Sequence, residues 1–446
     1  MRVFPLNNLL NANSRCFSKK FSFDLFPEVE ELLDSGDMKH KRHPGTRKRL
    51  PILIPPTLAT AVDNLISEEG EKKIKQDALK FMEALSKRRQ PLEKEEIEMK
   101  LQQRFHKHSD DVDEIIESLT KDQLNALRNQ IRLESARWKP FEYNRQECLA
   151  YLVGRLNANY ASIWKVFNEI KSQLHTFQPE TFFDFGTGVG TAVWAANNHW
   201  AESIKEYFCV DSSPDMIEVA QTLLTDEFTK QEIFKNLYFR QFLPASENRK
   251  YDLVVSAYSL LDLPSFEERL KVIDILWRKT KDILVIIEHG NFAGFFSVLD
   301  ARDFILQLES DSSESDSLGA HIVAPCPHEL PCPMLNEEKK KSCGTYVNYE
   351  TSYPKHRTVI KKDWISYVVL RKGPIAAETH KWPRIVKPVI KKSGHVYCRC
   401  CCSNGNINEV IVTKGKHGRN AYRCARSSRI GDMMPVKIEP TTENIG

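Results

Sequence analysis

A glycine-rich loop between two apolar segments constrains the fold of this 446-residue chain more than any other feature. Residues 182–185 form an apolar segment typical of a buried strand, and Gly186, Gly188 and Gly190 follow it. Residues 191–199 then predict a helix. Glycine is required where the backbone turns sharply and lets a ligand approach closely, because a Cβ would block both. Together these features predict the nucleoside-binding half of a doubly wound sheet.

The spacing of these glycines indicates which nucleoside the loop would bind. Dinucleotide sites prefer G-x-G-x-x-G, whereas here the third glycine comes one residue earlier. With Asp184 before the loop, the pattern resembles the S-adenosylmethionine site of class I methyltransferases. Asp211, at the tip of the next apolar strand, is placed to accept hydrogen bonds from ribose hydroxyls. A dinucleotide site and a glycine turn that serves packing alone are the alternatives.

Further apolar segments extend the predicted sheet. Residues 237–241, 251–257, 283–288 and 364–371 have strand character, and helical segments alternate with them. This alternation predicts a mostly parallel sheet covered on both faces. Together with the loop's resemblance to methyl-donor sites, it indicates an α/β class I methyltransferase (Rossmann-like) doubly wound fold. Residues 57–175 carry apolar side chains at three-to-four spacing, which predicts helices that cap the sheet and end in a long helix pair.

The charge of the chain is unevenly distributed. The net charge is +4, yet residues 355–435 contain 18 Lys and Arg against 4 Asp and Glu, so the remainder is acidic overall. A basic tail on an acidic protein indicates a polyanionic partner, and we predict RNA rather than DNA. Residues 39–49 form a second basic run, either a solvated linker or, as the charge density favours, an arm along phosphates. No apolar run approaches the ~20 residues of a membrane span, so no membrane association is expected.

The first 23 residues are apolar and basic and contain no acid. Such a start is typical of a mitochondrial transit peptide. Residues 15–18 resemble a matrix-protease site with the cut after Phe17. A basic start without any targeting role is the alternative. We therefore predict that the protein resides in the mitochondrial matrix.

Cysteines cluster in the second half of the chain. Eight of eleven lie after residue 320, and Cys326, Cys332 and Cys343 are separated by five and ten residues. Structural zinc prefers paired ligands two to four residues apart, whereas iron–sulfur clusters take four thiolates at wider spacing. We therefore predict an iron–sulfur cluster, with zinc and unliganded buried thiols as alternatives. The candidates for the fourth ligand are Cys398, Cys400, Cys401 and Cys402.

The segment after the fourth predicted strand carries no recognisable catalytic motif. Amino-methylating RNA enzymes have Asn/Asp-Pro-Pro-aromatic there, but residues 256–262 read Ser-Ala-Tyr-Ser-Leu-Leu-Asp. Neither the fourth nor the fifth predicted strand offers a cysteine nucleophile. We predict that the fold kept its donor site and lost turnover, so no catalytic residue is assigned. Catalysis by positioning, with help from Tyr258 or Asp262, is the alternative.

Several motifs together resemble the methyltransferase-like protein 17 family, whose members are mitochondrial assembly factors of the small ribosomal subunit. The resemblance extends from about residue 42 to residue 435, and its most specific part is the double-cysteine segment. The motifs are His43-Pro44-Gly45, Asp184-Phe185-Gly186-Thr187-Gly188, Arg240-Gln241-Phe242-Leu243-Pro244, Asp300-Ala301-Arg302-Asp303, residues 324–333, Trp382-Pro383-Arg384-Ile385 and Tyr422-Arg423-Cys424-Ala425-Arg426.

The resemblance implies a protein that binds the maturing mitochondrial small ribosomal subunit through its rRNA and carries a [4Fe-4S] cluster. It also implies S-adenosylmethionine binding with little or no methyl transfer; an active rRNA methyltransferase is the alternative. The implied cluster ligands are Cys326, Cys332, Cys343 and Cys401. The implied donor-site residues are Asp184, Gly186, Gly188, Gly190, Asp211 and Gln241.

These observations predict a division of the chain into segments, with Cys401 tying the basic tail to the sheet. They are a transit peptide (1–17), a basic extended arm (18–56), a helical domain (57–175), a methyltransferase-like domain (176–310), a cysteine-rich insertion (311–357), the last strands of the sheet (358–373) and a small basic C-terminal β domain (374–446).

Overall fold

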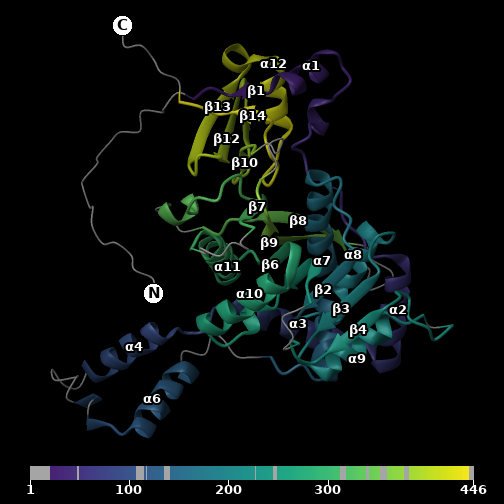
Figure 1. Ribbon diagram of the computed structural model, residues 1–446, viewed down its shortest axis with the longest axis vertical. Helices are drawn as coiled ribbons and strands as arrows, with labels where there is room; N and C mark the ends of the chain where they lie inside the picture. The colour runs from purple at the N-terminus through teal and green to yellow at the C-terminus, as the bar shows by residue number, and fades with distance from the viewer. Residues whose placement is uncertain are drawn as a thin grey trace.

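The computed structural model places most of the chain after the predicted transit peptide, which lies outside the described residues (Figure 1). None of the described helices is long and apolar enough to cross a membrane. The described residues are 21–47, 50–106, 115–116, 118–134, 141–226, 228–244, 249–311, 318–337, 341–351, 359–375 and 381–440.

A mixed sheet forms the centre of the molecule, in the order β4-β3-β2-β5-β6-β9-β7, with β8 paired to β9. The strands from β4 to β6 are parallel, whereas β9 runs antiparallel to β6 and to β7. This strand order is that of class I methyltransferases and confirms the predicted fold. The strands are β2 (Thr181–Phe185), β3 (Glu206–Val210), β4 (Leu237–Arg240), β5 (Tyr251–Ala257), β6 (Thr280–His289), β7 (Ala320–Ala324), β8 (Thr345–Glu350) and β9 (Ile360–Lys372).

Helices cover both faces of the sheet because its strands alternate between two apolar faces. On one face, α7 (Arg145–Gln173), α8 (Thr191–Trp200) and α9 (Pro214–Leu223) pack against side chains such as Leu253. On the other face, α10 (Phe266–Lys279) and α11 (Phe292–Asp311) pack against Val254 and its neighbours.

The predicted helix pair at the end of the helical segment is wrong, because α7 is one helix of 29 residues. Asn144 caps its start, where its side chain accepts hydrogen bonds from the backbone N–H groups of Gln146 and Glu147. Gly154 does not interrupt the helix. A Cβ there would lie 3.0 Å from the side chain of Met82, so glycine allows α3 to pack closely.

The helical segment before α7 divides into two parts. Helices α2 (Pro56–Glu69) and α3 (Glu71–Lys87) pack on the sheet domain, with α3 lying along α7. Helices α4 (Lys94–His106) and α6 (Lys121–Glu134) pack against each other around Ile97 and project from the body (Figure 1).

The C-terminal domain is a small sheet covered by α12 (Lys414–Ser427), and it lies above the central sheet in Figure 1. Residues from the start of the chain complete it, because Phe23 is fully buried beside Val396 and Met434 in its core. Its elements are β10 (Arg384–Ile385), β11 (Ile390–Lys392), β12 (His395–Cys401), β13 (Ile407–Thr413) and β14 (Val436–Lys437), together with β1 (Asp24–Leu25), α1 (Pro27–Asp34) and the 3-10 helix η1 (His40–Arg42).

Two predicted segment boundaries are therefore corrected. Residues 18–56 are not simply an extended arm, because β1 pairs with β14 and η1 packs on α12. The last strands of the sheet are not confined to residues 358–373, because β7, inside the predicted insertion, pairs with β9. In both cases the partner strand lies far away in the sequence, so no local pattern marks the pairing.

Candidate donor site and cysteine centre

The glycine loop follows β2 and has the conformation that its sequence predicts. The backbone φ angles of Gly186, Gly188 and Gly190 are +70°, +50° and +78°, which L side chains rarely adopt. A Cβ on Gly186 would lie 2.0 Å from the Oγ of Ser259, whereas the space beside Gly188 is open up to Tyr151, 4.0 Å away. The loop therefore requires glycine at the first position for space and at all three for conformation.

The two predicted acids lie on either side of this loop. Asp184 is 1% exposed beneath it and accepts a hydrogen bond from the Thr187 hydroxyl at 2.7 Å; burial raises the pKa of Asp184 to about 7. Asp211 accepts hydrogen bonds from the backbone N–H groups of Gly188 at 2.7 Å and Ser213 at 3.0 Å. Gln241 is exposed after β4. Asp184 thus supports the loop from below, while Asp211 and Gln241 lie at the carboxyl edge of the sheet, where ligands of such folds bind.

The segment after β5 begins with a strained residue. Tyr258 has a φ of +62°, and its ring lies 4.7 Å from the ring of His289 and 5.2 Å from the Arg155 guanidinium carbon. Its phenol lines a small cavity whose wall also includes Asp262 and Glu288. Strain of this kind clusters at functional sites, and this is the position where class I enzymes carry catalytic groups.

The helical domain covers this end of the sheet. Arg88, at the end of α3, pairs with Asp262 and stacks 4.6 Å from the ring of Phe141. Gln90 then donates to the Ala293 carbonyl at 3.3 Å. Glu93 pairs with Arg269 on α10 at 2.7 Å. Residues 88–93 therefore form a strap from α3 across the carboxyl ends of β5 and β6.

The predicted cluster ligands come together beside α11. Cys326, Cys332 and Cys343 line one cavity. Burial raises the pKa of Cys401, and the three other thiols raise it further, which places Cys401 beside them. The Nε2 of His328, in the loop between the first two cysteines, lies 3.3 Å from the Cys401 sulfur. Among the described residues, however, no three His, Cys, Asp or Glu side chains are close enough to hold a metal ion.

Strand β12 separates the candidates for the fourth ligand because successive side chains point to opposite faces. Cys398, Cys400 and Cys402 pack in the apolar core of the C-terminal domain with Cys424. Cys401 is on the opposite face, as is Arg399, which pairs with Glu337 of the insertion. Of the four candidates, the structure brings only Cys401 to the other three predicted ligands.

The chemistry of this thiol set fits an iron–sulfur group. Burial raises the pKa of Cys332 to about 12, and it raises the pKa of Cys343 further. Buried thiols of this kind are weak nucleophiles without a metal to stabilise the thiolate. Together with Cys326 and Cys401 they give four thiols from two domains, which is the donor set of an iron–sulfur cluster.

Comparison with known proteins identifies the family. Residues 145–435, more than half of the chain, match the family described as Mitochondrial small ribosomal subunit Rsm22. The chain belongs to this family. The human protein named Ribosome assembly protein METTL17, mitochondrial, is 36% identical over 401 residues, which are 89% of this chain and 86% of that protein. This match confirms the family resemblance of the sequence motifs.

A more distant relative from yeast agrees with the Rsm22 assignment. The Saccharomyces cerevisiae protein named Ribosome assembly protein RSM22, mitochondrial, is 20% identical over 68% of this chain and 69% of its own length. Among solved structures, magnesium protoporphyrin IX methyltransferase from Synechocystis with bound SAM is 14% identical over 53% of this chain and 87% of that chain, with a TM-score of 0.31. The fold assignment rests on the strand order described above.

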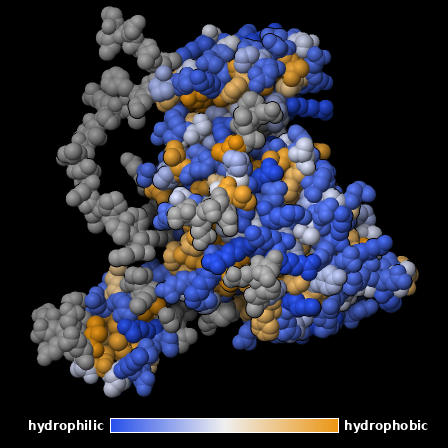
Figure 2. Space-filling view, in the orientation of Figure 1, coloured by the Kyte–Doolittle hydropathy of each residue, from blue (hydrophilic) through white to orange (hydrophobic). Residues whose placement is uncertain are grey.

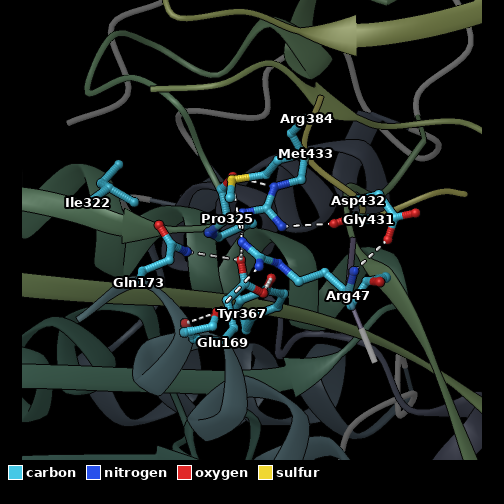
Figure 3. Close-up of polar contacts among 12 residues, drawn as sticks. Arg47, Glu169, Gln173, Ile322, Pro325, Tyr367, Arg384, Gly431, Asp432 and Met433 are labelled. Atoms are coloured by element: carbon cyan, nitrogen blue, oxygen red, sulfur yellow. Dashed lines mark hydrogen bonds and ion pairs between the residues drawn. The ribbon is translucent and has the colours of Figure 1, made fainter. Parts of the chain in front are cut away.

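A buried carboxylate joins the parts of this Rsm22-family chain (Figure 3). Glu169 of α7 is 1% exposed and pairs with Arg384 at 2.7 Å and with Arg47 at 3.2 Å. The Tyr367 hydroxyl of β9 donates to it at 2.8 Å. Arg384 also donates to the carbonyl of Pro325, next to Cys326, at 2.9 Å. The Glu169 cluster thus links the N-terminal segment, α7, the sheet, the cysteine loop and the C-terminal domain.

Local sequence patterns do not indicate this cluster, and its geometry corrects one prediction made from them. Arg47 belongs to the basic run of residues 39–49, yet it is only 8% exposed, as is expected of a paired cation and not of a phosphate-binding arm. Lys39, Lys41 and Arg42 are exposed as predicted. The sequence marks Arg384 through the Trp-Pro-Arg-Ile motif, but this motif does not indicate that Glu169 is its partner.

Substitution of Glu169 tests whether the Glu169 cluster holds the domains together. Burial alone would raise the pKa of Glu169, but Arg384 and Arg47 lower it to about 2 from an ordinary value of 4.5. Its contribution to stability is therefore complete above about pH 4.5 and is lost as the pH falls toward 2. Glu169→Gln leaves two buried cations without a counter-charge, which should cost about 3–5 kcal/mol at neutral pH.

Hydrogen exchange of β12 and β13 amides measures this loss at pH 7. The matched control is Glu180→Gln, because Glu180 and its partner Lys205 are both largely exposed. This substitution should change the free energy of unfolding by less than about 1 kcal/mol. Equal protection in Glu169→Gln and the control would contradict the role of the Glu169 cluster.

Proposed function

We propose that this chain is a mitochondrial ribosome assembly protein that binds the maturing small subunit through its rRNA in the mitochondrial matrix. In this proposal it also carries a [4Fe-4S] cluster and an S-adenosylmethionine site that no longer supports methyl transfer. The observation that carries the proposal is a basic face on the C-terminal domain, joined to the sheet at the cysteine centre. The names of the human and yeast relatives support it.

The basic face is built from two elements, η1 and α12, that are distant in the sequence. Exposed Arg419 and Arg423 lie on α12, and no described carboxylate pairs with them. Helix η1 packs against α12, where the Ser427 hydroxyl donates to the His40 carbonyl at 2.7 Å. Arg426 donates to the Lys392 carbonyl of β11 at 3.2 Å. The face is therefore composed of Lys39, Lys41, Arg42, Arg419, Arg423 and Arg426.

This arrangement suits RNA. Cations without carboxylate partners can release counterions from phosphates, which supplies most of non-specific affinity. Tyr422 lies beside the cations of this face, because the Arg426 guanidinium is 3.5 Å from its hydroxyl. On the opposite face of the small sheet, Lys392 lies 5.6 Å from the Tyr397 ring and forms a second cation–aromatic pair. Aromatic rings beside cations can stack on unpaired bases. The surface over this domain is largely hydrophilic in Figure 2, as expected for such an interface.

The donor site and the strap together support binding without transfer. The glycine loop and Asp211 keep the geometry that a nucleoside requires. Residues 88–93 cross the carboxyl ends of β5 and β6, where a methyl acceptor would bind, and Arg88 forms an ion pair with Asp262. A macromolecular acceptor would have to displace the strap to reach this end. An active rRNA methyltransferase would have the same intact loop. Methyl transfer to rRNA is therefore the second candidate function.

Removing cations from the basic face tests the RNA interface. We expect the double variant Arg419→Ala, Arg423→Ala to bind transcribed small-subunit rRNA more weakly. The slope of log affinity against log salt should fall by about 0.7–0.9 for each phosphate that the face no longer neutralises. The matched control is Lys271→Ala with Arg278→Ala on α10, both exposed and paired within their own helix. An unchanged slope in the α12 variant would contradict this interface.

Replacing Cys401 tests the cysteine centre. Cys401→Ser should abolish bound iron and acid-labile sulfide in protein purified without oxygen, because a cluster needs four thiolates. Cys398→Ala, on the opposite face of β12, should keep both. Zinc at one per chain in the unaltered protein would refute the iron–sulfur proposal, and equal iron loss in both variants would refute Cys401 as the fourth ligand.

Substitutions in the glycine loop separate donor binding from catalysis. Gly186→Ala should abolish S-adenosylmethionine binding in calorimetry, because its Cβ would overlap the Ser259 hydroxyl. Gly188→Ala meets open space and has only backbone strain to overcome, so it should weaken binding less. We expect small-subunit assembly and rRNA methylation to be unchanged in cells that carry Gly186→Ala. Loss of a specific rRNA methyl group would instead support the active enzyme.

A further inference from the structure

Arg302 of α11 is a buried cation inside the cysteine centre. Its side chain is 3% exposed, and it lines the same cavity as Cys326, Cys332 and Cys343. The other side chains around this cavity, such as Phe295 and Leu299, are largely apolar. A charged group in such surroundings is costly unless a partner offsets it. Its position therefore requires an explanation.

One nitrogen of the Arg302 guanidinium fixes the loop between the first two cysteines, and a second pairs with the neighbouring Asp303. Nη2 donates to the carbonyl oxygens of His328 at 3.1 Å and Leu330 at 2.6 Å. Nη1 pairs with Asp303. Because arginine is planar and rigid, these bonds orient the loop and hold the guanidinium at the edge of the cavity.

The third guanidinium nitrogen of Arg302, Nε, makes no hydrogen bond to the described residues. It is nevertheless buried. Buried donors are nearly always paired, so an unpaired one indicates a group that completes the site. The positive charge of Arg302 also indicates that a further group completes the site. Its partner Asp303 has a side chain that is 47% exposed, so it offsets the guanidinium charge mainly from the solvent side.

We propose that Arg302 is a positioning residue of the cysteine centre, which holds the 326–332 loop and presents its Nε–H to the sulfur ligands of an anionic iron–sulfur cluster. This inference rests on the proposed cluster. A hydrogen bond and a positive charge next to the sulfurs stabilise the more negative, reduced state, so Arg302 raises the reduction potential. A role limited to fixing the loop would leave the potential unchanged.

The test compares three variants of the full chain, purified without oxygen. Arg302→Met removes the charge and every hydrogen bond, whereas Arg302→Lys keeps the charge alone. Asp303→Asn removes the outer partner and leaves Nε in place. For each protein, iron and sulfide per chain, the rate of iron loss to a chelator and the midpoint potential of the loaded fraction are measured.

We expect Arg302→Met to lose iron about 10–100-fold faster, as is usual when an outer partner of a metal site is removed. Its potential should be lower than that of the unaltered chain, with Arg302→Lys between the two and Asp303→Asn no lower than the unaltered chain. Should Arg302→Met fail to fold, Arg302→Lys still reports on the missing Nε–H. Equal potentials in all loaded proteins would overturn the role of Arg302 alone. An unaltered chain without iron and sulfide would overturn the cluster as well.

Discussion

The arrangement of the domains depends on one buried carboxylate. Glu169 is removed from water in the middle of α7, and a charge in that position persists only with close partners. Its partners Arg47 and Arg384 come from opposite ends of the chain. If either end left, Glu169 would lose one of the two cations that offset the cost of its burial. The sheet domain and the C-terminal domain are therefore expected to unfold as a coupled unit, although each has its own apolar core.

Local sequence patterns predicted the features whose partners are local. The apolar run of β2 and the glycines after it determine a strand and a tight turn, so both could be predicted from the sequence. The separation of Cys401 from the other three candidates was also predictable, because the period of two in β12 places Cys398, Cys400 and Cys402 on one face. The role of the N-terminal segment could not be predicted. The pairing of β1 with β14 and the burial of Arg47 depend on residues more than a hundred positions away.

The same long-range contacts change how the donor site is interpreted. Sequence alone shows a glycine loop followed by a segment without a catalytic motif, which leaves open whether an acceptor could still reach a bound donor. The structure adds a physical obstacle, because Arg88, Gln90 and Glu93 attach the helical domain to three elements around the carboxyl ends of β5 and β6. A strap held by two ion pairs and hydrogen bonds can open, but opening has a free-energy cost that each catalytic cycle would have to meet. None of these three strap contacts involves Gly186 or Asp211, which is why we propose that donor binding persisted after methyl transfer was lost.

An iron–sulfur cluster at the cysteine centre would, like Glu169, hold the C-terminal domain to the sheet, but through metal–thiolate bonds and not ion pairs. Cys326, Cys332 and Cys343 belong to the insertion, and Cys401 belongs to the C-terminal domain. A group bonded to all four would close a long loop of chain, and such a closure restricts the unfolded state more than the folded one. The Glu169 cluster already holds Arg384 and, through it, the carbonyl next to Cys326. The Glu169 cluster would therefore bring the C-terminal domain to the sheet first, which favours binding of an iron–sulfur group by all four cysteines. The basic face on α12 would be fixed to the sheet only when both the Glu169 cluster and the iron–sulfur group are in place. In the proposed function, an iron–sulfur group would thus control RNA binding without touching the RNA.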